Sequence, residues 1–211
     1  MNRQALKAGL LGLAVLLVSG CASMSADECM MSDWRAVGYE DGARGYTTAQ
    51  FGSRRKACAK HGVTADFEAY QEGRREGLVE YCQPARGFQV GANGGQYAGV
   101  CDAALEGGFV EAYRIGSELY TLRSAVNSAS SAVASREGEL NRIEDAIRSA
   151  EAALIAKETA TEDRVLLLAD LKDLSERKGS IESEIESLIA DRAAAEVELA
   201  NYRATIAEYG Y

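Results

Sequence analysis

Apolar side chains recur at three- and four-residue spacing along most of the second half of the chain, in two series over residues 119–154 and 167–209. Such spacing over several heptads is typical of the seam of a coiled coil. The two series do not share one register, because Leu154 and Leu171 lie seventeen residues apart, which is two heptads plus three. The pattern therefore predicts two long helices with a change of direction or phase between them.

A fold-back of the chain would account for that change of register. When paired residue numbers sum to 321, seam positions face seam positions along the whole length; Leu140 faces Ile181, for example. The charged residues within the seam then face uncharged partners, so that their long stems can cover the seam while their charges reach water. We therefore predict an antiparallel helical hairpin over 109–211, and the alternative is a stammer in one continuous helix that forms a parallel oligomer. The charged seam residues are Arg136, Lys178 and Arg192.

The turn of this hairpin is expected near 159–162, at the centre of the fold-back. Thr159 and Glu162 have the spacing of a capping box, which would open the second helix. Each arm would have roughly 45 residues and a length of ~65–70 Å at ~1.5 Å per residue. The acidic residues outside the seam are expected to form a solvated face, and a docking surface for another helical protein is the alternative.

The first half of the chain has a different composition. Residues 21–108 hold 14 of the 21 glycines and the sole proline, Pro84. Within residues 29–116 a short phrase recurs, with tyrosine three residues before glycine, at Tyr39, Tyr70 and Tyr113. Glycine at this spacing allows another backbone to approach one face of a helix. We expect a head of short, closely packed helices over 29–108, for which Asp33 and Asp66 are N-cap candidates.

The N-terminus has the make-up of a secretory signal peptide. Arg3 and Lys7 precede an apolar run of thirteen residues, whose ~20 Å of helix is too short for the ~30 Å core of a bilayer. Residues 17–21, Leu-Val-Ser-Gly-Cys, resemble the lipobox of bacterial lipoproteins, in which the cysteine becomes the acylated first residue. We expect a cleaved signal peptide over 1–20, lipidation of Cys21 and a tether over 21–28.

Ala22 follows this cysteine where such lipoproteins carry an outer-membrane sorting signal, so the expected location is the periplasmic face of the outer membrane. With Cys21 acylated, an even number of cysteines remains, and in an oxidising compartment this predicts two disulfides with three possible pairings. The disulfide candidates are Cys29, Cys58, Cys82 and Cys101.

The charge balance excludes some partners. The formal net charge is −9, and loss of residues 1–20 leaves 21 basic against 32 acidic residues, a net charge of −11. A chain this acidic is a poor candidate for nucleic acid or for anionic lipid surfaces. One basic cluster, Arg54-Arg55-Lys56 with Lys60, stands out. We interpret it as a solvated face or a partner for the acidic arms, with contact to lipid headgroups near the anchor as the alternative.

One set of residues spread over the head is distinctive in combination. Its members are Cys29, Trp34, Gly38, Asp41, Gly42, Gly45, Arg54, Arg55, Cys58, Gly62, Tyr70, Gly73, Arg74, Gly77, Leu78, Tyr81, Cys82, Gly94, Tyr97, Cys101, Phe109, Tyr113 and Gly116. With this set, residues 29 to about 122 resemble bacterial lipoproteins grouped as domain of unknown function family 2799. The resemblance implies an uncharacterised envelope lipoprotein and supplies no catalytic residue, and the coiled-coil extension lies outside it.

The sequence contains no catalytic constellation. Cys58 and His61 share a helix face, but a metal site needs further ligands and the chain has only one histidine. We expect no enzyme activity, no metal and no cofactor. We expect an all-α structural or protein-interaction module, anchored to the membrane and contacting an envelope protein or a second copy through the coiled coil. The alternative is an envelope ligand-binding module on a head surface formed by Trp34, Tyr39, Asp41, Tyr70, Arg74 and Tyr113.

Overall fold

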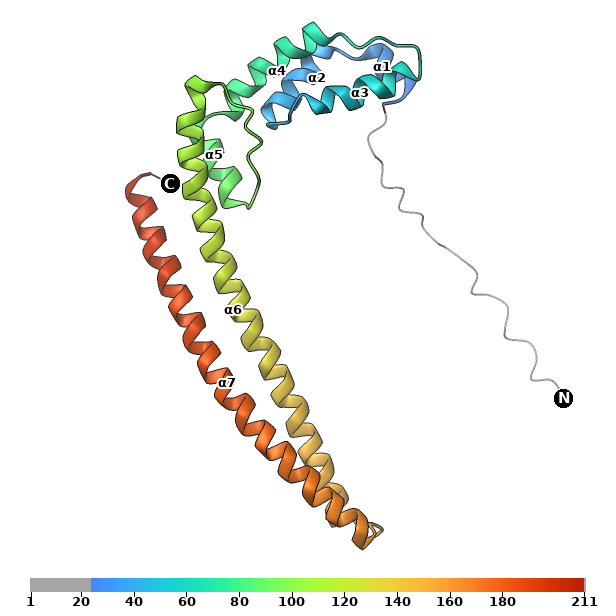
Figure 1. Ribbon diagram of the computed structural model, residues 1–211, viewed down its shortest axis with the longest axis vertical. Coiled ribbons are helices and arrows are strands. Elements are labelled where there is room, and N and C mark those ends of the chain that lie inside the picture. Colours follow the sequence, from blue (N-terminus) through green and yellow to red (C-terminus); the bar gives the residue numbers. More distant parts are fainter. Residues whose placement is uncertain (1–23, 211) are drawn as a thin grey trace, which may run out of the picture.

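The computed structural model describes residues 24–210 and is all-helical over that range. A head of short helices is followed by one long antiparallel hairpin (Figure 1). The predicted signal peptide and Cys21 lie outside the described residues. The helices are α1 (Ala26–Met31), α2 (Trp34–Ala43), α3 (Ala49–Ala59), α4 (Phe67–Tyr81), α5 (Pro84–Ala92), α6 (Ala103–Ile155) and α7 (Thr161–Glu208).

Two of the short helices begin at the N-caps that the sequence predicts. The Asp33 carboxylate accepts hydrogen bonds from the backbone N–H groups of Arg35 and Ala36, at the start of α2. The Asp66 carboxylate accepts one from the N–H of Ala69, at the start of α4. Each cap satisfies donors that a helix start otherwise leaves free, so both boundaries are fixed locally by the sequence.

The head is built from two pairs of parallel helices whose backbones touch at glycines. In the first pair, α2 with α4, a methyl group on Gly38 would lie 2.0 Å from the carbonyl oxygen of Tyr70, and one on Gly77 would lie 2.1 Å from that of Tyr39. Distances this short leave no room for any side chain. Glycine is therefore required at the crossing, and the backbones approach closely enough for weak Cα–H···O contacts.

The second pair, α5 with the first turns of α6, repeats this packing. A methyl group on Gly91 would lie 2.2 Å from the carbonyl oxygen of Tyr113, and one on Gly116 would lie 2.1 Å from that of Phe88. The sequence Gly-Tyr-Glu-Asp-Gly-Ala-Arg-Gly at 38–45 matches Gly-Phe-Gln-Val-Gly-Ala-Asn-Gly at 87–94. The head therefore contains two copies of one structural unit, and each unit is a pair of parallel helices that cross at glycines.

The ends of the two units are alike as well. Gly45 follows α2 with φ 74° and lies against the ring of Tyr81, and Gly94 follows α5 with φ 71° and lies against the ring of Tyr120. A positive φ favours glycine at both positions. In this correspondence Tyr70 matches Phe109, not Tyr113. The tyrosine-glycine phrase around Tyr113 is thus out of register with the structural repeat.

Each unit carries one of the two disulfides, which bond Cys29 to Cys58 and Cys82 to Cys101. Parallel helices begin at the same end of their pair, so the segments that lead into them lie close together. Each disulfide joins those two leading segments, with Cα atoms 5.4 and 5.7 Å apart. The structure thus selects one of the three pairings that the sequence left open.

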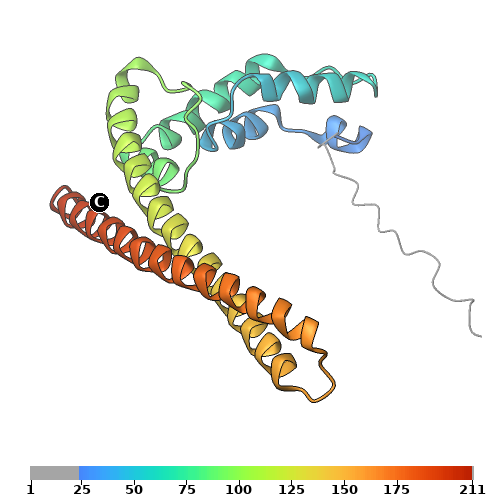
Figure 2. The same cartoon turned by 60° about the horizontal axis from the view of Figure 1, so that its bottom comes forward.

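The antiparallel hairpin of α6 and α7 confirms the predicted fold-back (Figure 2). Lys178 Nζ lies 3.1 Å from a carboxylate oxygen of Glu144, and Arg136 Nε lies 3.0 Å from one of Glu184, close to the predicted register. Ile143, Ile181 and Ile185 form a buried cluster midway along it. The charged seam residues Arg136 and Lys178 therefore pair with carboxylates across the seam.

Helix α6 belongs to both parts of the molecule. Its 53 residues give a length of ~80 Å, and its first turns form the second helix pair of the head. The expected boundary between 108 and 109 therefore falls inside a helix. The C-terminal end of α7 returns to this junction, where Ile206 packs with Leu119 and Phe88 and the Tyr202 hydroxyl donates to the carbonyl of Ile115 at 2.9 Å.

The hairpin turn spans residues 156–160, slightly earlier than the predicted 159–162. The predicted capping box is wrong, because α7 starts after Ala160 without a side-chain cap. The Thr159 hydroxyl donates instead to the carbonyl of Ala153, and the Arg164 guanidinium donates to that of Ala156. The last carbonyls of a helix lack partners, and those of α6 take the nearby donors.

The glycine crossings predict that glycine-to-alanine substitutions have opposite effects on stability at a crossing and away from one. Gly77→Ala in α4 places its methyl group against the Tyr39 carbonyl, so we expect a loss of about 1–3 kcal/mol in the free energy of unfolding. Gly52→Ala in α3 meets nothing within 4 Å, so we expect a gain of about 0.5–1 kcal/mol. Urea unfolding followed by circular dichroism measures both. Shifts of the same sign for the two variants would contradict the close crossing.

Candidate functional site

The only buried charged group among residues 24–210 is the Asp41 carboxylate, which is 0% exposed. It accepts hydrogen bonds from Arg54 Nη2 at 2.7 Å and Nε at 3.2 Å, and from the Tyr70 hydroxyl at 2.9 Å. The guanidinium thus binds the carboxylate with two donors, the strongest geometry available to this pair. Burial raises the pKa of Tyr70, and the hydrogen bond to Asp41 raises it further.

This trio fixes α3 to the first helix pair. Arg54 is the contribution of α3, whereas Asp41 and Tyr70 come from α2 and α4. On the same side of α3, the Phe51 ring packs 4.7 Å from the Tyr70 ring and 5.9 Å from the Trp34 ring, measured between centroids. None of the buried polar atoms of the trio lacks a hydrogen-bond partner, so it has the properties of a structural cluster.

The second unit supports this interpretation. Val90 and Phe109 occupy the positions that correspond to Asp41 and Tyr70, and they pack together in a buried cluster. The second unit returns from its first helix through the irregular segment 93–102 instead of through a helix like α3. Because the second unit has no helix like α3 to hold in place, the position that corresponds to Asp41 is apolar there.

Two further residues that the sequence singled out make equivalent hydrogen bonds in the two units. Arg74 donates through Nε and Nη2 to the carbonyl of Tyr46, at 3.1 and 2.8 Å. The Tyr113 hydroxyl donates to the carbonyl of Gly95 at 3.1 Å. Each bond runs from the second helix of a pair to the turn after the first, so both residues hold a turn in place.

The expected binding surface of six residues is therefore wrong as a shared surface. Trp34, Asp41 and Tyr70 are buried, because large aromatic rings and a paired carboxylate fill the space between three helices. Of the six, Tyr39 is on the exposed side of α2, where Glu80 raises its pKa through a hydrogen bond. The residue types suggested a ligand site, but three of the six side chains are part of the core and Arg74 and Tyr113 hold turns.

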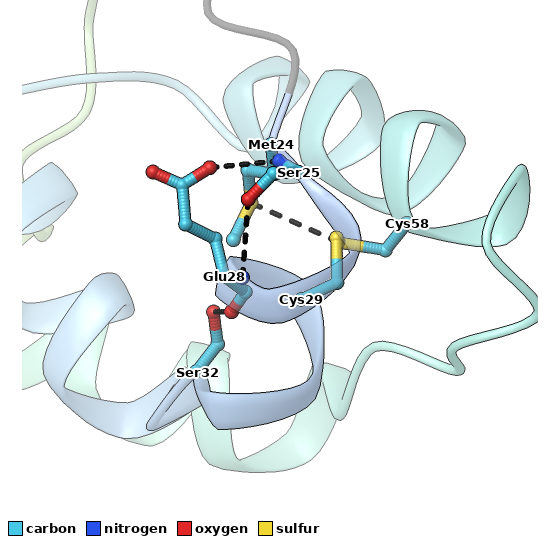
Figure 3. Close-up of a disulfide and its surroundings, with 6 residues drawn as sticks. All are labelled: Met24, Ser25, Glu28, Cys29, Ser32 and Cys58. Carbon is cyan, nitrogen blue, oxygen red and sulfur yellow. Dashed lines mark hydrogen bonds between the residues drawn. A yellow bond between two sulfur atoms is a disulfide. The ribbon is translucent and has the colours of Figure 1, made fainter.

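The Cys29–Cys58 disulfide lies at the end of the head where the described chain begins (Figure 3). Both cysteines are buried, and Met24 Sδ lies 3.8 Å from Cys58 Sγ. Ser25 and Glu28 form a reciprocal capping box that opens α1. The hydrogen bond from the Ser25 N–H lowers the pKa of Glu28. Cys58 is thus bonded to Cys29 and is neither a free nucleophile nor a metal ligand.

The described part of the chain holds no group of three or more His, Cys, Asp or Glu side chains placed to bind a metal ion. None of its helices combines the length and the apolar character needed to cross a membrane. Exposed large apolar side chains do gather at the hairpin turn. Ile155, Val165, Leu166 and Leu168 are between 56% and 80% exposed. The sequence reasoning missed this patch, which the run of four apolar residues at 165–168 could have indicated.

The Asp41 trio predicts that one truncation is costly and that full replacement is not. Arg54→Ala leaves a buried carboxylate unpaired, so we expect a loss of about 3–5 kcal/mol in the free energy of unfolding. The triple variant Asp41→Val, Arg54→Leu, Tyr70→Phe copies the apolar second unit, and we expect it to recover most of that loss. Urea unfolding of the disulfide-bonded chain measures both. Arg54→Ala unfolding at the wild-type urea concentration would contradict the assignment.

Comparison with known protein families finds one similarity, which lies in the head. Residues 33–118 match the model of the family described as Protein of unknown function (DUF2799). No curated protein and no solved structure matches the chain. The matched range starts at the N-cap of α2 and ends within α6, so it covers both helix pairs and omits most of the hairpin. The head of this chain, over residues 33–118, is thus similar to the DUF2799 family of proteins of unknown function.

Proposed function

We propose that the protein is an outer-membrane lipoprotein on the periplasmic side, with a lipid anchor at Cys21, whose hairpin is an arm that docks on another envelope component. The lipobox-like sequence at 17–21 and the two disulfides, which suit an oxidising compartment, support the location. The hairpin supports the role of an arm, because it extends far beyond the head and ends in the turn at 156–160 (Figure 1).

The observation that carries the docking role is the apolar patch at the hairpin turn. Ile155, Val165, Leu166 and Leu168 expose large aliphatic side chains at the point of the arm most distant from the head. A hairpin that acted only as a spacer would gain nothing from them, and their exposure to water is unfavourable. Clustered apolar exposure of this kind marks interaction surfaces.

The alternative of a ligand-binding head has less support. Three of the six side chains that motivated it are buried, and two others hold turns through backbone hydrogen bonds. The partner of the arm is either a different envelope protein or a second copy of this chain, and the size of a crosslinked product separates the two.

The anchor predicts covalent acylation at one residue. We expect the chain to incorporate labelled palmitate in a bacterial host and to fractionate with the outer membrane. Cys21→Ser removes the acceptor sulfur, so the label should be lost and the chain should move to the soluble periplasmic fraction or keep its leader. A Cys82→Ser, Cys101→Ser variant is the control, because it removes cysteines but leaves the acceptor. Absence of label in the wild-type chain would overturn the anchor.

The docking arm predicts contacts at its turn. A photo-crosslinking residue at Glu162, which is exposed beside the apolar patch, should give a defined adduct in intact cells. Replacing Ile155, Val165, Leu166 and Leu168 by serine should weaken that adduct at least ~tenfold, because the apolar contact area is lost. Ile189→Ser with Val197→Ser changes exposed apolar residues of α7 that lie away from the turn, and this variant is the matched control. Equal adduct in both variants, or none in the wild type, would contradict a docking role.

A further inference from the structure

Three of the four residues in the basic cluster of the head form no ion pair with an acidic residue of the described chain. The segment 42–65 contains five basic residues and no acidic one, in a chain of net charge −9. Arg54 is bound to the buried Asp41, but Arg55, Lys56 and Lys60 have no ion-pair or hydrogen-bond partner among the described residues. All three side chains are exposed. They form a group of free cations, which we call the α3 basic face.

Lys60, at the C-terminal end of this face, lies where the described chain begins. Met24 and Ser25 line a surface depression together with Ala57, Lys60 and His61. The Cys29–Cys58 disulfide holds α1 against the C-terminal end of α3, with Cα atoms 5.4 Å apart. Figure 3 shows Met24 beside this disulfide, with its sulfur atom facing that of Cys58.

The position of the anchor then limits how far the α3 basic face can lie from the membrane. Cys21 precedes Met24 by three residues, and three residues span at most ~11 Å when fully extended. An acyl group on Cys21 therefore brings the C-terminal end of α3 to about one Debye length, ~8–10 Å, from the bilayer surface. We propose that the α3 basic face binds the anionic headgroups of the membrane that holds the anchor, an inference that rests on the proposed lipidation.

The neighbouring groups are compatible with a lipid surface. The Glu28 carboxylate of α1 accepts a hydrogen bond from the Ser25 N–H and is turned away from Cys58 (Figure 3). Asp27 is the other acid of α1, and three free cations outnumber these two carboxylates. Met30 and Met31, which follow Cys29 directly, are 65% and 85% exposed. Exposed apolar side chains together with cations are the composition that a membrane interface accommodates.

The acidic arm does not neutralise the face. No ion pair joins Arg55, Lys56 or Lys60 to a described carboxylate of α6 or α7, and both views place the end of α3 on the side of the head away from the hairpin (Figures 1 and 2). The expectation that this cluster partners the acidic arms is therefore wrong. The overall negative charge is screened over that separation, so a local basic face can act although the whole chain has little attraction for anionic lipid.

A vesicle experiment tests the face without depending on acylation. The full chain with Cys21→Ser, which cannot be acylated, is mixed with vesicles of pure phosphatidylcholine or of phosphatidylcholine with 30% phosphatidylglycerol, and binding is measured by co-sedimentation. Each cation near an anionic surface strengthens binding about fivefold. We expect Arg55→Gln, Lys56→Gln, Lys60→Gln to reduce the preference for anionic vesicles on the order of a hundredfold, and 0.5 M salt to reduce it similarly.

The matched control removes the same charge from the arm. Arg123→Gln, Arg142→Gln, Arg203→Gln changes three exposed arginines without ion pairs, and we expect it to keep the preference of the parent chain. The exchange Arg55→Lys, Lys56→Arg, Lys60→Arg keeps the charges and should keep the preference. Equal preference in the α3 and arm variants, both with wild-type helicity and disulfides, would overturn the proposal. The palmitate assay, by contrast, reports on the anchor alone, so the two failures are distinguishable.

Discussion

The contact between helix backbones at glycine is the constraint on which the rest of the head depends. In both helix pairs a methyl group at the crossing would lie about 2 Å from a carbonyl oxygen, so the pair forms only because no side chain is present there. Close approach also requires both helices to be straight and regular at the crossing. Aromatic residues of those helices therefore lie at positions beside the crossing glycines, and Tyr70 and Phe109 are fully buried there.

The parallel direction of each pair explains the other features of the head. Two consecutive parallel helices need a return connection, which is α3 in the first unit and the irregular segment 93–102 in the second. Their starts lie at the same end, so a disulfide can join the segments that lead into them, as it does in both units. Where the return is a helix, a buried ion pair between Arg54 and Asp41 holds it, and where it is a loop the same place is apolar.

The parts of the structure that could be predicted from the sequence are those encoded by local periodicity. The seam spacing predicts the hairpin and its register, because each helix repeats the same signal over many turns, and the N-caps at Asp33 and Asp66 depend on neighbouring residues only. The capping box predicted at Thr159 does not form, because the Thr159 hydroxyl donates to a carbonyl of the preceding helix instead. The binding surface failed for a related reason.

Burial of Asp41 depends on Arg54, which is thirteen residues away and on another helix. The repeat of the helix pair was likewise not apparent from the sequence. The tyrosine-glycine phrases are alike in residue type, whereas the two structural units align by the position of each residue relative to the crossing glycines. A single sequence does not reveal which residues on different helices contact each other.

The continuity of α6 decides how the head and the arm act together. One helix forms half of the second unit and half of the hairpin, and α7 returns to pack Ile206 against Leu119 and Phe88 at the junction. The Tyr202 hydroxyl adds a hydrogen bond to the backbone of α6 at the same level. Because no loop separates the two parts, a change in the direction of the arm requires bending α6 or disrupting this packed junction. The orientation of the head on a surface would therefore set the direction in which the arm points.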